Sequence, residues 1–203
     1  MTREEPVGDS GAVGAMTDRG RWGAPTFISL LRGINVGGHR KIRMEDLRAL
    51  YASLGFSPVR SYIQSGNVVF GGATGGGAIV AGKIEEALAA NFGFDVPVIL
   101  RTAAEMEDVA RGNPFLGEGV DPSKLHVTFL KGAASDQARG DFAAHRVGSD
   151  ELRLVGREAY LHCPGGMART KLTPTFLERV LGSASTTRNW RTVNAVLEMA
   201  RSI

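Results

Sequence analysis

Residues 59–71 read VRSYIQSGNVVFG, and this stretch decides the fold. Two runs rich in β-branched and aromatic residues, 59–64 and 67–71, are separated by Ser65 and Gly66. Two small turn-forming residues between such runs are a signal for a tight β-hairpin. We therefore expect two antiparallel strands joined by a two-residue turn.

The segments on either side of this hairpin complete a larger unit. Residues 27–32 (FISLLR) form an apolar run typical of a strand, and residues 96–101 (VPVILR) form another. Between these strands and the hairpin, apolar residues recur at helical spacing over 47–54 and 79–88, and a glycine follows each stretch. After the last strand, Thr102 and Glu105 have the pattern of a capping box that opens a short helix. The order strand, helix, two strands, helix, strand is that of a split βαβ, or ferredoxin-like, unit.

The second half of the chain repeats this order. LHVTFL (125–130) predicts a strand, a helical stretch follows around Phe142, and ELRLVGREAYLHC (151–163) predicts a hairpin. Thr173 and Pro174 are typical of a helix start, and a last helix carries Trp190 in the core. The sequence thus predicts an α+β protein of two ferredoxin-like units related by internal duplication. We place them at residues 25–116 and at residues 117–203, the second with the C-terminal helix.

Composition and the N-terminal segment restrict the class of protein. The 203 residues include 24 Lys+Arg and 21 Asp+Glu, for a net charge of +3. Residues 1–24 have no periodic apolar pattern and no signal-peptide core, so we expect a disordered tail; Met1 and Met16 are both candidate start codons. No window holds the ~18 consecutive apolar residues of a membrane span. With Cys163 as the one cysteine and no metal-ligand spacing, we expect a cytoplasmic protein without a membrane partner, metal or cofactor.

Several blocks of the sequence also carry a family resemblance. The blocks are FISLLRGINVGG (27–38), KIRMEDLRALYASLGF (41–56), VRSYIQSGNVVF (59–70), KLHVTFL (124–130) and TTRNWRTVN (186–194). Together, in this order, they resemble a bacterial family known only as domain of unknown function 1697. The resemblance extends over the chain after residue 24 and implies the paired α+β architecture. It brings no reaction, cofactor or catalytic residue. The family's usual aromatic residue after YLH is replaced by Cys163, which argues against a special thiol role.

The loop RGINVGGHRKIR (32–43) is the first candidate site. Gly33, Gly37 and Gly38 permit positive φ, so that successive backbone N–H groups can form an anion-binding nest. The loop also carries Arg32 and three further cations without an acid: Arg40, Lys41 and Arg43. Its glycine spacing is that of a P-loop, but His39 and Arg40 stand where Lys-Ser/Thr is required, which argues against an NTPase. The alternative explanation is a glycine turn with solvated charges.

Topology brings a second segment to this loop. The first two strands of a split βαβ unit run parallel, so both end at the same edge of the sheet. We therefore expect Asn35, on the loop, to lie beside Gln64, Ser65 and Asn67 of the hairpin. Amides and a hydroxyl next to backbone donors and arginines suit a phosphate or a carboxylate; a plain hairpin turn is the alternative.

TTRNWRTVN (186–194) is the second candidate. Thr186 or Thr187 is expected to cap the last helix, whose N-terminus with Arg188 and Arg191 favours an anion. The two arginines could instead pair with acids of the other half.

Three classes of function fit these observations. The first is a binding module for an anionic ligand, either a small phosphorylated molecule or a nucleic acid. The second is an enzyme on a small anionic metabolite, with arginine clamps and His126 or His162 as acid or base. The third is an oligomerising protein without a ligand. The enzyme requires a pocket that joins those histidines to the loop 32–43. Ligand identity, oligomeric state and the orientation of the two halves do not follow from the sequence.

Overall fold

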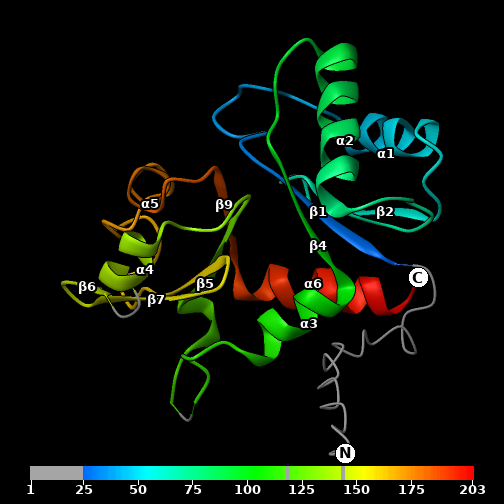
Figure 1. Ribbon diagram of the computed structural model, residues 1–203. Coiled ribbons are helices and arrows are strands. Elements are labelled where there is room, and N and C mark those ends of the chain that lie inside the picture. Colours follow the sequence, from blue (N-terminus) through cyan, green and yellow to red (C-terminus); the bar gives the residue numbers. More distant parts are fainter. Residues whose placement is uncertain (1–24, 118, 143–144) are drawn as a thin grey trace, which may run out of the picture.

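The computed structural model describes residues 25–117, 119–142 and 145–203 (Figure 1). The predicted tail, residues 1–24, lies outside these ranges. The first sheet has the strand order β2-β3-β1-β4, and neighbouring strands are antiparallel throughout. Its strands are β1 (Phe27–Leu31), β2 (Val59–Tyr62), β3 (Asn67–Phe70) and β4 (Val98–Thr102). Helices α1 (Met44–Ser53) and α2 (Gly77–Phe92) pack on one face.

The second sheet repeats this arrangement with one strand more. Its order is β6-β7-β8-β5-β9, again antiparallel between neighbours. The strands are β5 (Leu125–Leu130), β6 (His145–Val147), β7 (Asp150–Val155), β8 (Glu158–His162) and β9 (Ser185–Asn189). Helices α4 (Asp136–Phe142) and α5 (Pro174–Leu181) cover one face. Without β6, the order matches that of the first sheet, and the α+β class is confirmed.

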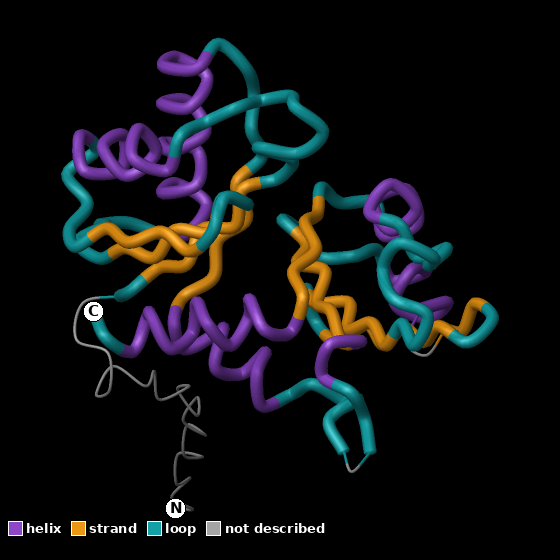
Figure 2. The backbone as a smooth tube through the Cα atoms, turned by 180° about the vertical axis from the view of Figure 1, so that it is seen from behind, coloured by secondary structure: helices purple, strands orange, loops and turns teal. Residues whose placement is uncertain are grey.

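Two helices beneath the first sheet also reach the second and so join the two halves. Helices α3 (Ala103–Arg111) and α6 (Trp190–Arg201) run side by side along both sheets, as Figure 2 shows. Their apolar faces meet Ile28 and Val69 from the first sheet and Val127 and Phe129 from the second in one continuous cluster. Trp190 belongs to this cluster, so its expected place in the core is confirmed. A division of the chain at residues 116–117 stays a prediction, because α6 packs on both halves.

Local signals predicted most element boundaries. Thr102 and Glu105 form the reciprocal capping box that opens α3, and the Thr173 side chain caps α5. The two-residue turn at Gly156 and Arg157, between β7 and β8, is also confirmed. In the described part of the chain, no helix combines the length and the apolar character needed to cross a bilayer.

Three local predictions are wrong. Tyr62 pairs with Asn67, so the first hairpin has a four-residue turn, 63–66, instead of a two-residue turn. Residues 185–189 form strand β9, and Asn189 caps α6 in place of Thr186 or Thr187. The polar run STTRN becomes a strand because it pairs with β5. This pairing partner is distant in the sequence, so the residues around 185–189 do not reveal it. Ile79, expected on the buried face of α2, is 71% exposed.

Candidate functional site

The loop after β1 exposes backbone donors. Gly37 and Gly38 have φ values of 59° and 80°, in the left-handed region that favours glycine. The turn is closed by a hydrogen bond from His39 N–H to the Val36 carbonyl, 3.1 Å. Within the described residues, the N–H groups of Gly37 and Gly38 donate to no protein acceptor, and a side chain at Gly38 would meet no atom within 4 Å. These two N–H groups are therefore open to a ligand.

The loop and the β2–β3 turn are held together, as the topology predicts. The Asn35 side-chain amide donates to the carbonyls of Gln64 and Ile42, at 2.8 and 2.9 Å, and its oxygen accepts from Ile42 N–H. Gly66 fits tightly in this contact, because a Cβ there would lie 2.7 Å from the Leu31 Cβ. Asn35 thus fastens the loop to the turn, and its hydrogen-bonding groups are already in use.

Arg188 of β9 reaches across to the same edge and is buried there. Its Nε donates to the Asn67 side-chain oxygen at 2.5 Å, and its Nη2 donates to the carbonyls of Leu31 and Ser65 at 2.8 and 2.9 Å. Its Nη1 donates to Thr186 and Thr187 of its own strand. All five guanidinium N–H donors therefore have protein acceptors. None of these acceptors is a carboxylate, and burial lowers the pKa of Arg188 to about 10.

Ser65 and Asn67 serve the same junction. The Asn67 side chain is fully buried and donates to the Ser65 hydroxyl and to the Tyr62 carbonyl, at 3.0 and 3.1 Å. Both residues contact Arg188 in the structure, and their expected place in a ligand site stays a prediction. Their polar atoms, like those of Arg188, contact the protein itself.

The other cations of this edge differ in their partners. Arg32 pairs with Glu178 of α5, and Arg43 pairs with Asp46 one helical turn away. Arg40 and Lys41 are exposed and have no carboxylate partner within the described ranges. Arg191, in the first turn of α6, is also exposed and makes no hydrogen bond or ion pair to another described residue.

A shallow cavity of about 410 Å³ lies where the loop meets the turn. Its lining residues are Asn35, Gly38, Lys41, Ile42, Arg43 and Gln64, none of them acidic. Of the residues predicted from the sequence, Asn35, Gly38 and Gln64 line this cavity. Arg32, Gly33, Gly37 and Arg191 do not line it.

The candidate histidines lie elsewhere. His126 on β5 is 9% exposed, burial lowers its pKa, and its Nδ1 has no hydrogen-bond partner among the described residues. His162 on β8 has its Nδ1 3.8 Å from a Glu151 carboxylate oxygen. Neither residue lines the cavity at the loop. In the part of the chain that the structure describes, no three His, Cys, Asp or Glu residues gather into a metal-binding group. Cys163 is buried, which raises the pKa of its thiol.

Comparisons with known proteins agree with this fold. A solved structure, titled "The structure of conserved bacterial protein SP0830 from Streptococcus pneumoniae", is similar with a TM-score of 0.68 and 24% sequence identity. The match covers 87% of this chain and 99% of that one, and it shows the fold alone. A search of curated proteins found no match. The family model described as "Protein of unknown function (DUF1697)" matches residues 25–160. Since this match spans most of the chain, the protein belongs to the DUF1697 family.

Proposed function

We propose that this protein binds an anionic ligand, a small phosphorylated molecule or a nucleic acid, at the edge formed by the loop 32–43 and the turn 63–66. We call this surface the basic edge. One observation carries the proposal. The basic edge holds five cations, and three of them, Arg40, Lys41 and Arg188, have no carboxylate partner within the described residues. The excess positive charge would be neutralised by a bound anion.

In this proposal the cationic side chains supply charge, and the backbone supplies hydrogen-bond donors. Arg40 and Lys41 are exposed and free to move onto a ligand, while the N–H groups of Gly37 and Gly38 supply directional donors. Arg188 contacts no ligand directly in this arrangement. Its buried charge lies behind the turn and adds to the positive potential there, while its hydrogen bonds with Asn67 and Ser65 keep the turn in place. Arg32, Gly33 and Arg191 stay in the proposed site as flanking residues.

The size and lining of the cavity favour a small phosphorylated ligand over a nucleic acid. A volume of about 410 Å³ lies within the usual range for small-molecule sites. The described residues that line it include no aromatic side chain on which a base could stack. The catalytic alternative has less support, because His126 and His162 do not reach the cavity.

Calorimetric titration with pyrophosphate tests the proposal. We expect the wild-type protein to bind pyrophosphate at millimolar concentration or below, and the double variant Arg40→Gln/Lys41→Gln to bind at least about tenfold more weakly. That loss corresponds to about 1.4 kcal/mol, less than one typical charge-assisted hydrogen bond.

The matched control removes two exposed cations elsewhere, in Arg111→Gln/Lys171→Gln, and should change the affinity less than twofold. Equal affinities of the two double variants would refute the site. A short oligonucleotide that binds more tightly than pyrophosphate, with a steep salt dependence, would identify a nucleic acid as the ligand instead.

A further inference from the structure

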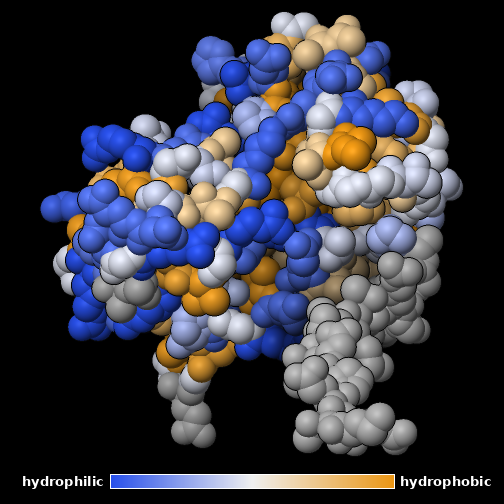
Figure 3. Space-filling model, viewed as in Figure 1, coloured by the Kyte–Doolittle hydropathy of each residue, from blue (hydrophilic) through white to orange (hydrophobic). Residues whose placement is uncertain are grey.

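A larger cavity lies at the junction of the two halves, away from the basic edge. Its volume is about 860 Å³, and it shares no lining residue with the cavity at the loop 32–43. One wall is apolar and comes from the first sheet, with Phe27, Val98 and Leu100. Lys131 and Arg157, which follow strands of the second sheet, also line the cavity. Figure 3 shows hydrophobic surface in the recess between the two halves, bordered by hydrophilic residues.

Arg157 supplies unused hydrogen-bond donors to this cavity. Its side chain is 38% exposed, and one nitrogen, Nη2, donates to the Glu105 carboxylate at 2.7 Å. A guanidinium has five N–H donors, and the other four find no acceptor in the described part of the protein. Lys131 is committed more fully, because its ammonium group contacts both carboxylate oxygens of Glu85, at 2.5 and 2.7 Å.

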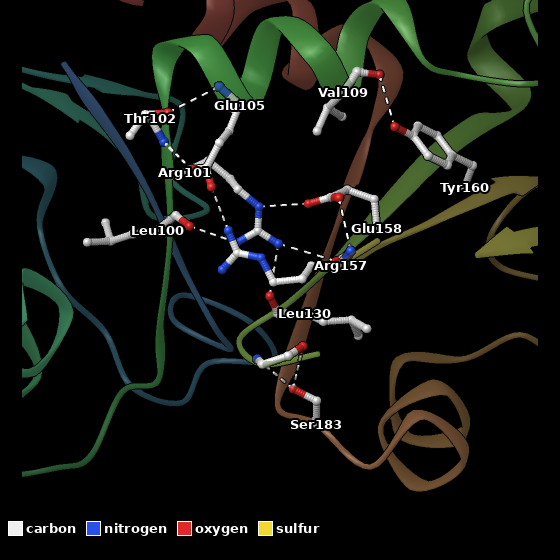
Figure 4. A network of polar contacts seen from close by, with 11 residues as sticks. Leu100, Arg101, Thr102, Glu105, Val109, Leu130, Arg157, Glu158, Tyr160 and Ser183 are labelled. Atoms are coloured by element: carbon white, nitrogen blue, oxygen red, sulfur yellow. Dashed lines mark hydrogen bonds and ion pairs between the residues drawn. The ribbon is translucent and has the colours of Figure 1, made fainter. Parts of the chain in front are cut away.

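The position of Arg157 is fixed from below by the buried Arg101. Figure 4 shows Arg101 at the centre of a polar network, with its Nε donating to Glu158 at 2.7 Å. The Nη2 of Arg101 donates to the carbonyls of Leu130 and Arg157, and Glu158 in turn accepts from the Arg157 backbone N–H. Because Arg101 is only 1% exposed and lines the floor of the cavity, the backbone that carries Arg157 is pre-organised.

The start of α2 adds backbone donors on the far side. Gly76 precedes the helix without a side-chain cap, and the first turn holds no acidic residue. The N–H groups of Gly77 and Ala78 donate to no acceptor within the described ranges. A Cβ at Gly76 or Gly77 would meet no atom within 4 Å, so this backbone is open to the cavity that it lines. The helix start therefore favours the same sign of ligand charge as Arg157.

We propose that this junction cavity is a second binding site, which takes a carboxylate or a phosphate monoester joined to an apolar group. The anionic group would contact the free side of the Arg157 guanidinium and the N–H groups of Gly77 and Ala78. The apolar group would lie against the exposed Pro25 and Ala78 and the exposed parts of Phe27 and Leu100, which are 4% and 9% exposed. Among the described lining residues Glu105 is the one acid, and its carboxylate accepts from one nitrogen of the Arg157 guanidinium. Sites of this size at the junction of two units commonly combine an apolar wall with a few fixed polar groups.

The test is calorimetric titration of the full chain with octyl phosphate and with octanoate, and with octanol and inorganic phosphate for comparison. We expect at least one of the two amphipathic anions to bind below about 1 mM, and octanol and phosphate to bind at least about tenfold more weakly. Whichever anion binds more tightly identifies the head group. Arg157→Gln should weaken that anion at least about tenfold. Ala78→Phe, at an exposed lining position, should fill the cavity and abolish binding.

Matched variants separate this site from other effects. Arg111→Gln removes an exposed arginine elsewhere, and Ile79→Phe adds the same ring at the next residue, which does not line the cavity; both should bind within twofold of the wild type. Arg40→Gln/Lys41→Gln should also leave binding in the junction cavity unchanged. A result that refutes the anion site at the basic edge can therefore be told apart from one that refutes this second site. Thermal melting of each variant checks that it folds. The proposal is overturned if neither anion binds at millimolar concentration, or if the folded Ala78→Phe protein binds as well as Ile79→Phe.

Discussion

Arg101 and Arg188 are both buried, and each joins the two halves of the molecule, but their charges are satisfied in different ways. Arg101 on β4 meets a carboxylate of the second sheet, Glu158, as well as backbone carbonyls. Arg188 on β9 meets carbonyl, hydroxyl and amide oxygens, and no carboxylate of any residue that the structure describes. Burial lowers the pKa of both side chains, and for Arg101 the neighbouring Glu158 opposes this effect.

Because of this difference, we assign Arg101 a structural role and expect the charge of Arg188 to attract a ligand. At Arg101 the positive charge is neutralised within the protein, so the network of Figure 4 contributes chiefly to the position of its neighbours. At Arg188 the charge is distributed over neutral dipoles and is not cancelled. A buried ion without a counter-ion is costly, and proteins keep one where five good hydrogen bonds offset the cost. The uncancelled charge lies directly behind the turn 63–66, where we propose the anion site.

The largest effect is expected from the removal of Arg188. Arg188→Met leaves the oxygens of Leu31, Ser65 and Asn67 without their donor in a buried contact between the two sheets. Each unsatisfied buried acceptor costs on the order of 1–3 kcal/mol, and removal of the buried charge offsets part of this cost. We expect the free energy of unfolding, measured in urea, to fall by about 3–5 kcal/mol.

Arg191→Met, at an exposed arginine three residues later, is the control and should change stability by less than about 0.5 kcal/mol. A loss below about 1 kcal/mol in Arg188→Met would show that water replaces the guanidinium, and the junction would then not depend on it.

A smaller loss of stability is expected when Arg101, like Arg188, has no carboxylate partner. Glu158→Gln removes the carboxylate but keeps an oxygen that can accept from Arg101 Nε. The hydrogen bond from Arg101 Nε persists, while the counter-ion and the longer hydrogen bond from the Arg157 backbone N–H are lost. We therefore expect a loss of about 1–3 kcal/mol in urea unfolding, less than the 3–5 kcal/mol for breaking a buried pair outright.

Glu198→Gln removes a carboxylate from an exposed pair with Arg201 and serves as the control, with an expected change below about 0.5 kcal/mol. If Glu158→Gln has no larger effect than Glu198→Gln, neutral oxygens alone satisfy the buried charge of Arg101. Arg101 and Arg188 would then be stabilised in the same way.

The fold was largely predictable because its signals are local. Helix caps such as Thr102 and Thr173, and the Gly156-Arg157 turn, depend on residues within four positions of one another. Strand β9 was not predictable in this way, since its five residues are polar and pair with β5 across more than 50 positions of sequence. The four-residue turn was missed because Ile63 adopts a φ of 49°, which a β-branched residue rarely does.

The candidate site was predictable only where topology alone decides proximity. Parallel first and second strands placed Asn35 beside Gln64, and the structure brings them within hydrogen-bonding distance. The partners of Arg188 were not predictable, because Leu31 and Asn67 are more than 120 residues away in sequence. The junction cavity was missed for a related reason. Gly75, Gly76 and Gly77 belong to a glycine-rich run whose composition indicates a linker, and only the packing of the two sheets brings Arg157 to the cavity that they line.

The smallest effect is expected from the reverse exchange, in which Arg188 gains a carboxylate. Asn67→Asp places a charged oxygen 2.5 Å from Arg188 Nε but removes the donor to the Tyr62 carbonyl and to the Ser65 hydroxyl; the hydroxyl can donate to the new carboxylate instead, so the contact with Tyr62 is the one lost. The ion pair and the lost hydrogen bond nearly cancel, so we expect stability at pH 7 to change by less than about 1 kcal/mol. The pH dependence of the stability of this variant is more informative.

If the attraction of the Arg188 guanidinium outweighs the effect of burial, the new carboxyl has a folded pKa below its unfolded value of about 3.9. Its contribution is then fully present above that pH and is lost as the pH falls through the folded pKa. Urea unfolding of the variant and the wild type from pH 7 to pH 3 should therefore show a constant difference down to about pH 4 and a relative loss below it. A variant that gains stability relative to the wild type between pH 7 and pH 5 would show a raised pKa, so that burial outweighs Arg188, and the positive charge that we assign to the basic edge would be too weak to hold an anion.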